Sequence, residues 1–256
     1  MFLLHDARTG QAEQIDPGPG RLLRTYAFGP AGHRPAHAAG LRPLLLADLI
    51  RRNAEHRHNV SVLACLVTDG DDAFRADVSA LNLRPAEQTV GAAERTGTAA
   101  DLGGPGEVIV AGRASHTVLA GPVTLADRDA DAAPLRVSDL EEHGFDPLTL
   151  RLAFLSRRHG EHLDLTWDGL AAADQALRRW RKFVAGWAES PSRPMCAEVT
   201  GQIAASFDDD LDTPGALRAL RSLEGDRQIP PGSKFETFAY TDQLLGLDLA
   251  RDVGRI

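Results

Sequence analysis

The sequence predicts an α/β protein in which a Rossmann-like parallel sheet is followed by a C-terminal helical bundle. Residues 41–57 carry leucines at helical spacing. Residues 60–67, VSVLACLV, form a continuous apolar and β-branched run, which is typical of a strand buried on both faces of a parallel sheet. Helical periodicity dominates after Pro147. We therefore expect one region over residues 1–145 and a helical bundle over residues 146–256.

The elements of the first region follow from short apolar runs and the turns between them. Strands are expected at residues 2–4 and 22–28, on either side of the turn-rich segment 16–20. The strand at 22–28, the helix at 41–57 and the strand at 60–67 then make a right-handed β-α-β unit. Further strands are expected at 106–112 and within 115–129, and an exposed loop is expected at 126–134.

The helical bundle is predicted from the spacing of its apolar residues. Thr166 is a suitable N-cap for its second helix, and Pro214 occupies the first position of its fourth. The expected helices cover residues 148–158, 167–187, 195–207 and 214–224, with a last short helix at 238–249.

Composition excludes some classes of protein. The 256 residues carry a formal net charge of -8, which supplies no overall attraction to nucleic acid. The two cysteines, Cys65 and Cys196, are far apart and outside any Cys-x-x-Cys pattern, which indicates a reduced, cytoplasmic protein. We expect no signal peptide, because the short apolar start at residues 2–4 has neither a basic region nor a cleavage site, and no apolar run approaches the roughly 20 residues that cross a bilayer. We expect no membrane partner.

Several stretches, taken in order, resemble one family. They are LLRTYAFGPAGHRPAHAAGLRPLLLADLIRR (22–52), VLACLVTDGDD (62–72), DLEEHGFDPLTLRLAFLSRRH (139–159), DDDLDTPGALRAL (208–220) and TDQLLGLDLA (241–250). The chain is similar in these segments to the cysteinyl-tRNA synthetases and mycothiol cysteine ligase, and the similarity skips roughly residues 75–125. The resemblance implies a class I synthetase nucleotide-binding core that lacks the family's long central insertion.

The family's zinc site is expected to be lost. Its first ligand is the cysteine of a Tyr-x-Cys-Gly-Pro turn, and the matching position here is Phe28, in Tyr26-Ala27-Phe28-Gly29-Pro30. Phenylalanine has no lone pair to give a metal. The other zinc ligands of the family lie in a central region that this chain is too short to contain. Zinc is therefore not expected, and Phe28 is assigned to the substrate pocket instead.

The first nucleotide signature of the family is kept in part, as His37-Ala38-Ala39-Gly40. The resemblance makes His37 the catalytic residue, which would hydrogen-bond a phosphate in the transition state. It places Gly29, Pro30, His37 and Gly40 around ATP. The start of the helix also offers free N–H groups to an anion.

The second signature, Lys-Met-Ser-Lys-Ser in the family, falls in register on residues 126–130. Its two lysines are gone, and Asp127 and Asp129 carry the wrong charge for a triphosphate. Arg128 and Arg136 are the candidate replacements.

The turn after the second strand offers Thr68, Asp69 and Asp71 as substrate-binding residues. Carboxylates at the carboxyl edge of a parallel sheet could bind an amine or magnesium. The alternative is a solvated acidic turn that caps the next helix.

Other polar and aromatic residues favour structural roles. A metal at His33 and His37 is disfavoured because their segment looks like a loop. We expect core packing for Trp167, Trp180, Trp187 and Cys65, surface or structural roles for His159 and His162, and solvated helix ends at His56, His58 and 208–210.

Two functions remain open. The first is a synthetase paralogue with a remodelled nucleotide or amino-acid pocket, which does not charge tRNA and acts on an acyl-adenylate in a small-molecule pathway as an ATP-dependent ligase. The second is a non-catalytic binding or regulatory protein that acts through a protein partner or as a homo-oligomer. ATP binding near His37 separates the two.

Overall fold

The computed structural model describes residues 2–17, 20–29, 37–91, 108–111, 117–126 and 135–255. Its centre is a parallel sheet built from β3 (Leu22–Phe28), β4 (Ser61–Val67), β5 (Gln88–Val90), β6 (Val108–Ala111) and β7 (Val118–Leu119). The strand order is β5-β4-β3-β6-β7, and each neighbouring pair is parallel. This order runs outward from β3 in both directions, as in doubly wound dinucleotide-binding folds. The predicted Rossmann-like α/β class is confirmed.

Two helices connect the first strands of the sheet. The first, α1 (Ala38–His58), joins β3 to β4, and α2 (Asp72–Ala80) joins β4 to β5. All three predicted elements of the β-α-β unit are present, although α1 begins three residues before the expected start at Leu41. No bounds were predicted for α2, which was named only as the helix after the acidic turn, and β5 was not predicted, because each is short and lacks a long apolar repeat.

The N-terminal strands differ from the prediction. The segment β1 (Leu3–Asp6) pairs antiparallel with β2 (Gln11–Gln14) across a tight turn in which Gly10 has φ 72°. A positive φ of this kind suits glycine, which lacks a Cβ. The partner of β1 is therefore β2, a fully exposed strand of polar residues that carries no apolar signal, and the strand at 22–28 belongs to the large sheet.

A small parallel pair lies beside the start of α1. It consists of β8 (Val123–Leu125) and β9 (Leu163–Leu165). The single strand expected within residues 115–129 is thus two strands, β7 and β8, in different sheets. The sequence did not predict β9, which lies within the region assigned to helices.

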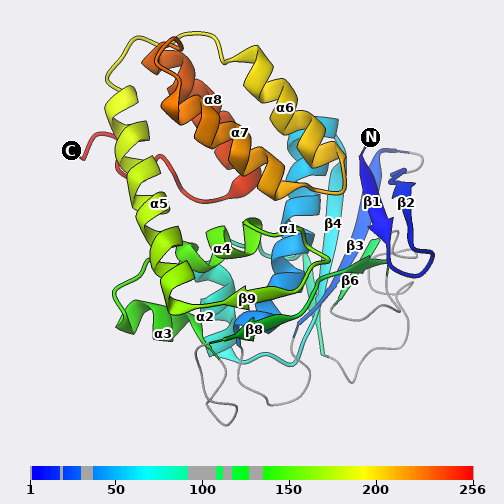
Figure 1. Cartoon of the computed structure of the whole chain (residues 1–256). Coiled ribbons are helices and arrows are strands. Elements are labelled where there is room, and N and C mark those ends of the chain that lie inside the picture. The colour runs from blue at the N-terminus through cyan, green and yellow to red at the C-terminus, as the bar shows by residue number, and fades with distance from the viewer. Residues whose placement is uncertain are drawn as a thin grey trace.

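Of the helices that follow, α3 and α5 lie away from the N-terminal hairpin, whereas the end of α6 lies beside β1 (Figure 1). Thr166 caps α5 by accepting from Gly169 N–H at 2.9 Å, as predicted, and Asp212 caps α7 in the same way. The last helix starts at Pro231, well before the predicted position 238, and α3 was not predicted. The bounds are α3 (Val137–Glu142), α4 (Leu148–Leu155), α5 (Trp167–Trp187), α6 (Ala197–Asp208), α7 (Thr213–Gly225) and α8 (Pro231–Leu245).

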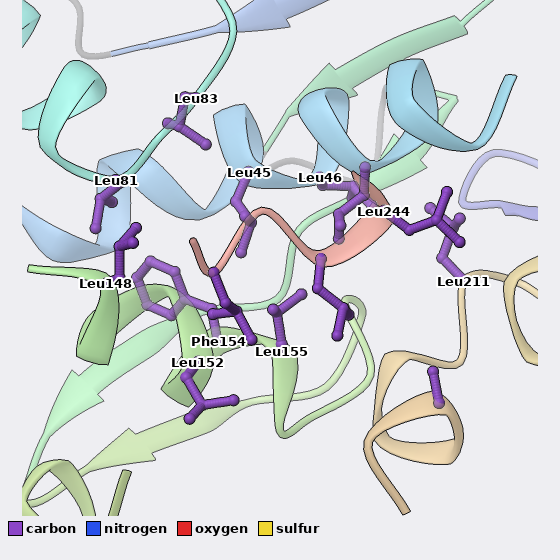
Figure 2. Packing of buried hydrophobic residues seen from close by; sticks show 14 of the residues in the cluster. Leu45, Leu46, Leu81, Leu83, Leu148, Leu152, Phe154, Leu155, Leu211 and Leu244 are labelled. Carbon is purple, nitrogen blue, oxygen red and sulfur yellow. The ribbon is translucent and has the colours of Figure 1, made fainter. Parts of the chain in front are cut away.

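One apolar core joins the sheet to these helices. Its buried members run from Phe2 to Leu249. Figure 2 shows leucines of α1 facing Phe154 and Leu155 of α4 and Leu244 of α8. Burial of each such side chain stabilises the fold by about 1.5–3 kcal/mol. Helix α1 is therefore shared between the sheet and the C-terminal helices.

A buried polar network lies next to this core. The Arg151 side chain on α4 is fully buried, with 0% exposure, and it donates to Asp48 at 2.6 Å and to the carbonyl oxygen of Leu245 at 2.5 Å. Arg52 donates to the same carboxylate at 2.7 Å and to the carbonyl oxygen of Gln243 at 3.1 Å. Burial opposes ionisation, but the two guanidinium groups hold the pKa of Asp48 below its usual value.

Among the described residues, no helix combines the length and apolar character needed to span a bilayer.

Candidate functional site

The carboxyl ends of β3 and β4 lie side by side, which brings two of the predicted site residues into contact. Phe28 is paired with Val67 in register, and Gly29 N–H donates to the carbonyl oxygen of Val67 at 3.0 Å. A Cβ on Gly29 would lie 2.8 Å from Thr68 Oγ1 and 3.1 Å from Phe74 Cζ. The place of a side chain at Gly29 is therefore already taken by Thr68 and Phe74.

The turn after β4 is held by its own polar groups. Thr68 N–H donates to the carbonyl oxygen of Val90 at 2.9 Å, and Thr68 Oγ1 accepts from Gly70 N–H at 3.0 Å. Asp71 is the N-cap of α2, because its Oδ1 accepts from Phe74 N–H at 2.9 Å. The capping interpretation thus accounts for one oxygen of Asp71. Thr68 and Asp69 also line a large cavity between α1 and α2.

His37 is the N-cap of α1. Its backbone is extended, and its Nδ1 accepts from Gly40 N–H at 3.3 Å. A nitrogen that accepts carries a lone pair, so the neutral ring bears its proton on Nε2 and presents a donor there. The Gly40 N–H was expected to be free for an anion. It donates to His37 Nδ1 instead. A small cavity of about 100 Å³ adjoins His37, Ala38 and Leu135.

The start of α1 is fixed by a buried arginine that the sequence analysis did not single out. Arg42 donates to the carbonyl oxygens of Gly121 at 2.9 Å, Glu161 at 2.6 Å and Arg158 at 2.9 Å. Burial lowers the pKa of Arg42 to about 10, so it stays charged at neutral pH. The one available signal was an arginine inside the apolar run at residues 41–46.

Arg136 lies at the same corner of the fold, since Ala38 N–H donates to the carbonyl oxygen of the preceding residue, Leu135, at 2.8 Å. Its NH2 group is 4.0 Å from Asp77 Oδ2 on α2. Within the described residues, Arg136 Nε and Asp77 Oδ2 are buried without a hydrogen-bond partner. Burial raises the pKa of Asp77, although Arg136 opposes the effect. A guanidinium group with a donor to spare therefore adjoins the start of α1.

Phe28 belongs to a small apolar cluster. It is half-buried and packs against the cluster of Tyr26, Cys65 and Val67. Cys65 is buried, as predicted for a small apolar residue. Within the described ranges, no group of three or more His, Cys, Asp or Glu side chains could hold a metal ion. Several residues named from the sequence lie outside the described residues, namely Pro30, His33, Asp127, Arg128 and Asp129.

The acidic run 208–210 lies at the end of α6, as predicted, and the Asp209 side chain is 68% exposed, but Asp208 and Asp210 form a structural junction that was not predicted. Asp208 accepts from Arg57 at 2.7 Å and pairs with His58 at 2.8 Å. Asp210 pairs with His159 at 3.0 Å and accepts from His5 N–H at 2.7 Å. These carboxylates join β1, α1 and the segment before β9.

The contacts of the histidines and the tryptophans test the structural roles predicted for them. His58 stacks on Phe2 and is not a solvated terminus, and His56 Nε2 lies 2.6 Å from Arg84 NH2. The structural role expected for His159 is confirmed by its contacts. Trp180 is fully buried, as expected, whereas Trp167 and Trp187 pack at the edge of the core.

No family model matches the chain. It is 34% identical over 119 residues to cysteine–tRNA ligase 1 of Burkholderia lata, which covers 45% of this chain and 24% of that protein. It is 37% identical over 120 residues to the L-cysteine:1D-myo-inositol 2-amino-2-deoxy-α-D-glucopyranoside ligase of Streptomyces griseus. This match covers 44% of this chain and 28% of that ligase. The ligase of the same name from Parafrankia sp. is 36% identical over 126 residues, which cover 44% of this chain and 27% of that ligase.

The chain is therefore a partial relative of the cysteine–tRNA ligases and mycothiol cysteine ligases, as the sequence motifs predicted. The matched part spans about a quarter of the length of the curated relatives, from 24% to 28%.

Proposed function

We propose that this chain is a shortened synthetase-type protein that binds a nucleotide or an aminoacyl-adenylate at the carboxyl edge of its sheet and does not charge tRNA. The observation that carries the proposal is the corner where His37 caps α1 beside Arg136, in a sheet whose strand order reverses at β3. Open α/β sheets bind ligands at such a reversal, beyond the carboxyl ends of the strands.

The His37 imidazole and the Arg136 guanidinium at this corner would each bind a different phosphate oxygen. The Nε2–H of His37 would donate to a phosphate oxygen, and the free donors of Arg136 would bind a second one. Arg136 would then take over part of the charge neutralisation that the family assigns to lysines. Thr68 and Asp69 would face the amino-acid part of the ligand, with the Asp69 carboxylate toward its amine.

The expected substrate is an acyl-adenylate of a small molecule. In such a reaction a carboxylate attacks the α-phosphorus of ATP and releases pyrophosphate, and an amine then displaces AMP from the acyl group. The names of the mycothiol cysteine ligases describe the joining of cysteine to an amino sugar. Because Phe28 occupies the position of the first zinc ligand, we propose that the acyl group here differs from cysteine.

The test is calorimetric titration with ATP and with a non-hydrolysable aminoacyl-sulfamoyl adenosine. The wild type should bind at least one of them, and His37→Ala and His37→Ser should both weaken binding about tenfold, since one charge-assisted hydrogen bond is lost. Serine still caps a helix, so His37→Ala alone should lower the free energy of unfolding, by about 1 kcal/mol. Weakened binding in His37→Ala but not in His37→Ser would assign His37 to the helix cap alone.

The second candidate is a non-catalytic protein that works through a protein partner or as a homo-oligomer. It is favoured by Phe183, which is 40% exposed and stacks on Trp187 with ring centroids 5.5 Å apart. Exposed aromatic pairs of this kind are common in protein interfaces. Absence of binding for both nucleotide probes, together with a concentration-dependent mass in light scattering that Phe183→Ser abolishes, would favour this candidate.

A further inference from the structure

A cavity of about 620 Å³ lies between α1 and α2 on one face of the parallel sheet. Right-handed crossovers place both helices on the same face, because β3, β4 and β5 follow one another outward. The floor is formed by residues paired across the strands, with Thr25 beside Ala64 and Ala27 beside Leu66. Paired residues point to the same face, so these mostly small side chains leave a hollow under the helices.

The walls come from one face of each helix. The residues involved recur at helical spacing, as expected for side chains that line a single groove. They are Leu44, Ala47, Asp48 and Arg51 of α1, and Phe74, Arg75, Val78 and Ser79 of α2. Small-molecule pockets usually enclose about 300–1,000 Å³, and this cavity falls within that range.

The polar groups of the cavity are unevenly available. The Asp48 carboxylate is occupied by Arg52 and Arg151 at 2.7 Å and 2.6 Å. Arg51 donates to Glu55, Glu87 and the carbonyl oxygen of Pro85. Each guanidinium has five N–H donors, so Arg51 keeps donors without an acceptor among the described residues.

The Arg84 guanidinium also keeps donors without an acceptor among the described residues. It pairs with Glu55 at 2.6 Å and lies against His56, and neither of these partners lines the cavity. Both arginines thus line one end of a largely apolar hollow, and each guanidinium has more donors than its described partners use. That end belongs to the last turns of α1 and the segment before β5, whereas Thr68 and Asp69 line the opposite end, at the carboxyl edge.

We propose that this cavity binds a small carboxylic acid with an apolar body. The apolar body lies over Ala27 and Ala64, and the carboxylate accepts hydrogen bonds from Arg51 and Arg84. The site differs from the nucleotide corner, because His37, Gly40 and Arg136 do not line it. The two meet only at Thr68 and Asp69, at the far end of the cavity from Arg51 and Arg84. The inference goes beyond the proposed function and does not depend on it.

The experiment is calorimetric titration of the full chain with straight-chain fatty acids from butanoate to dodecanoate, with octan-1-ol as the uncharged probe. One acid per chain is expected to bind, and affinity should rise with chain length until the hollow is filled. Arg84→Met should weaken octanoate about tenfold and leave octan-1-ol unchanged, since only the acid uses the guanidinium.

Filling the hollow should abolish binding of both probes. Ala64→Phe places a ring on its floor, and Ala47→Phe does the same from the wall, so either variant serves if the other fails to fold. Leu63→Phe is the matched control, because successive residues of a strand point to opposite faces of the sheet. Unfolding midpoints without ligand identify the folded variants.

Three results would overturn the proposal. They are no stoichiometric binding of any acid to the wild type, undiminished binding to both folded cavity-filling variants, and equal loss of octanoate and octan-1-ol in Arg84→Met. Octanoate binding that survives in His37→Ser and is not displaced by ATP would show that the cavity works independently of the nucleotide corner. Competition between ATP and octanoate would instead refute two separate sites.

Discussion

The polar groups around Arg151 and those at the carboxyl edge of the sheet are held in different ways. Arg151 of α4 and Arg52 of α1 join their two helices to each other, to the turn after α2 and to the end of α8. At the sheet edge, His37 and Asp71 each bond to the backbone three residues further along the chain. The first arrangement depends on the whole fold, and the second depends on single turns.

This difference explains how the family's chemistry can change while its fold persists. A buried ion pair that loses one partner leaves an uncompensated charge, so such a network tolerates little substitution. A helix cap contributes only about 0.5–2 kcal/mol, and several residue types can supply it. Substitutions at Phe28 or at the first signature therefore need not disturb the network that holds α1 in place.

The largest expected effect is at Arg151. Arg151→Met leaves Asp48 with one partner fewer and orphans the carbonyl oxygen of Leu245, so we expect a loss of about 3–5 kcal/mol in the free energy of unfolding. Urea denaturation measures the loss. The control is Arg75→Met, whose side chain is 68% exposed and pairs with Asp72, which is 98% exposed, and it should cost less than about 1 kcal/mol. Equal losses in the two variants would refute the contrast between the regions.

A smaller effect is expected at Gly29. Gly29→Ala places a methyl group 2.8 Å from Thr68 Oγ1, and such overpacking costs about 1–3 kcal/mol. Gly201 in α6 has open space around its position, so Gly201→Ala should instead stabilise the helix by about 0.5–1 kcal/mol. Thermal unfolding of both variants tests the close approach of β3 to Thr68, and a neutral Gly29→Ala would show that the strand ends are farther apart.

The smallest expected effect is the contribution of the Asp208 carboxylate to stability, which is lost at low pH. Burial raises the pKa of Asp208, but hydrogen bonds from Arg57 and His58 outweigh it and hold the value below the usual one. The stabilisation is therefore present above the unfolded pKa, about 3.9, and is lost as the pH falls through the lower folded value. Asp208→Asn should reduce stability at neutral pH by less than about 1 kcal/mol, because the side chain is 34% exposed.

Urea titrations of both proteins at neutral pH and below about pH 4 separate this contribution from others. The gap between wild type and Asp208→Asn should close in acid. A gap that stays constant across this range would mean that the Asp208 carboxylate does not contribute through its charge.

The sequence predicted the elements whose apolar pattern was long. The strand at 60–67, α1 and α5 were recognised because burial demands a run or repeat of apolar residues in each. The strands β2, β5 and β9 were missed since three or four residues carry too little pattern, and β2 is polar throughout. The start of α8 at Pro231 was missed because its buried first turn contains Ser233 and Lys234.

The site was predictable only where a local motif fixes it. The cap by His37 and the turn at Thr68–Asp71 follow from adjacent residues. The roles of Arg42, Arg136 and Arg151 depend on partners far away in the sequence, from 59 residues for Asp77 and Arg136 to 119 residues for Glu161 and Arg42. The hollow between α1 and α2 depends on register across three strands, which a single sequence does not reveal.

The bond from Arg52 to the carbonyl oxygen of Gln243 spans 191 residues. The ribosome synthesises Arg52 long before Gln243 and Leu245. Until then, the leucines of α1 are exposed in the nascent chain, and Arg52 lacks the carbonyl oxygen of Gln243 as an acceptor. The first helix can reach its native surroundings only after α8 has left the exit tunnel. Folding of this region should therefore be completed only after α8 has been made, and a nascent chain stalled before that point should be a substrate for chaperones that bind exposed apolar segments.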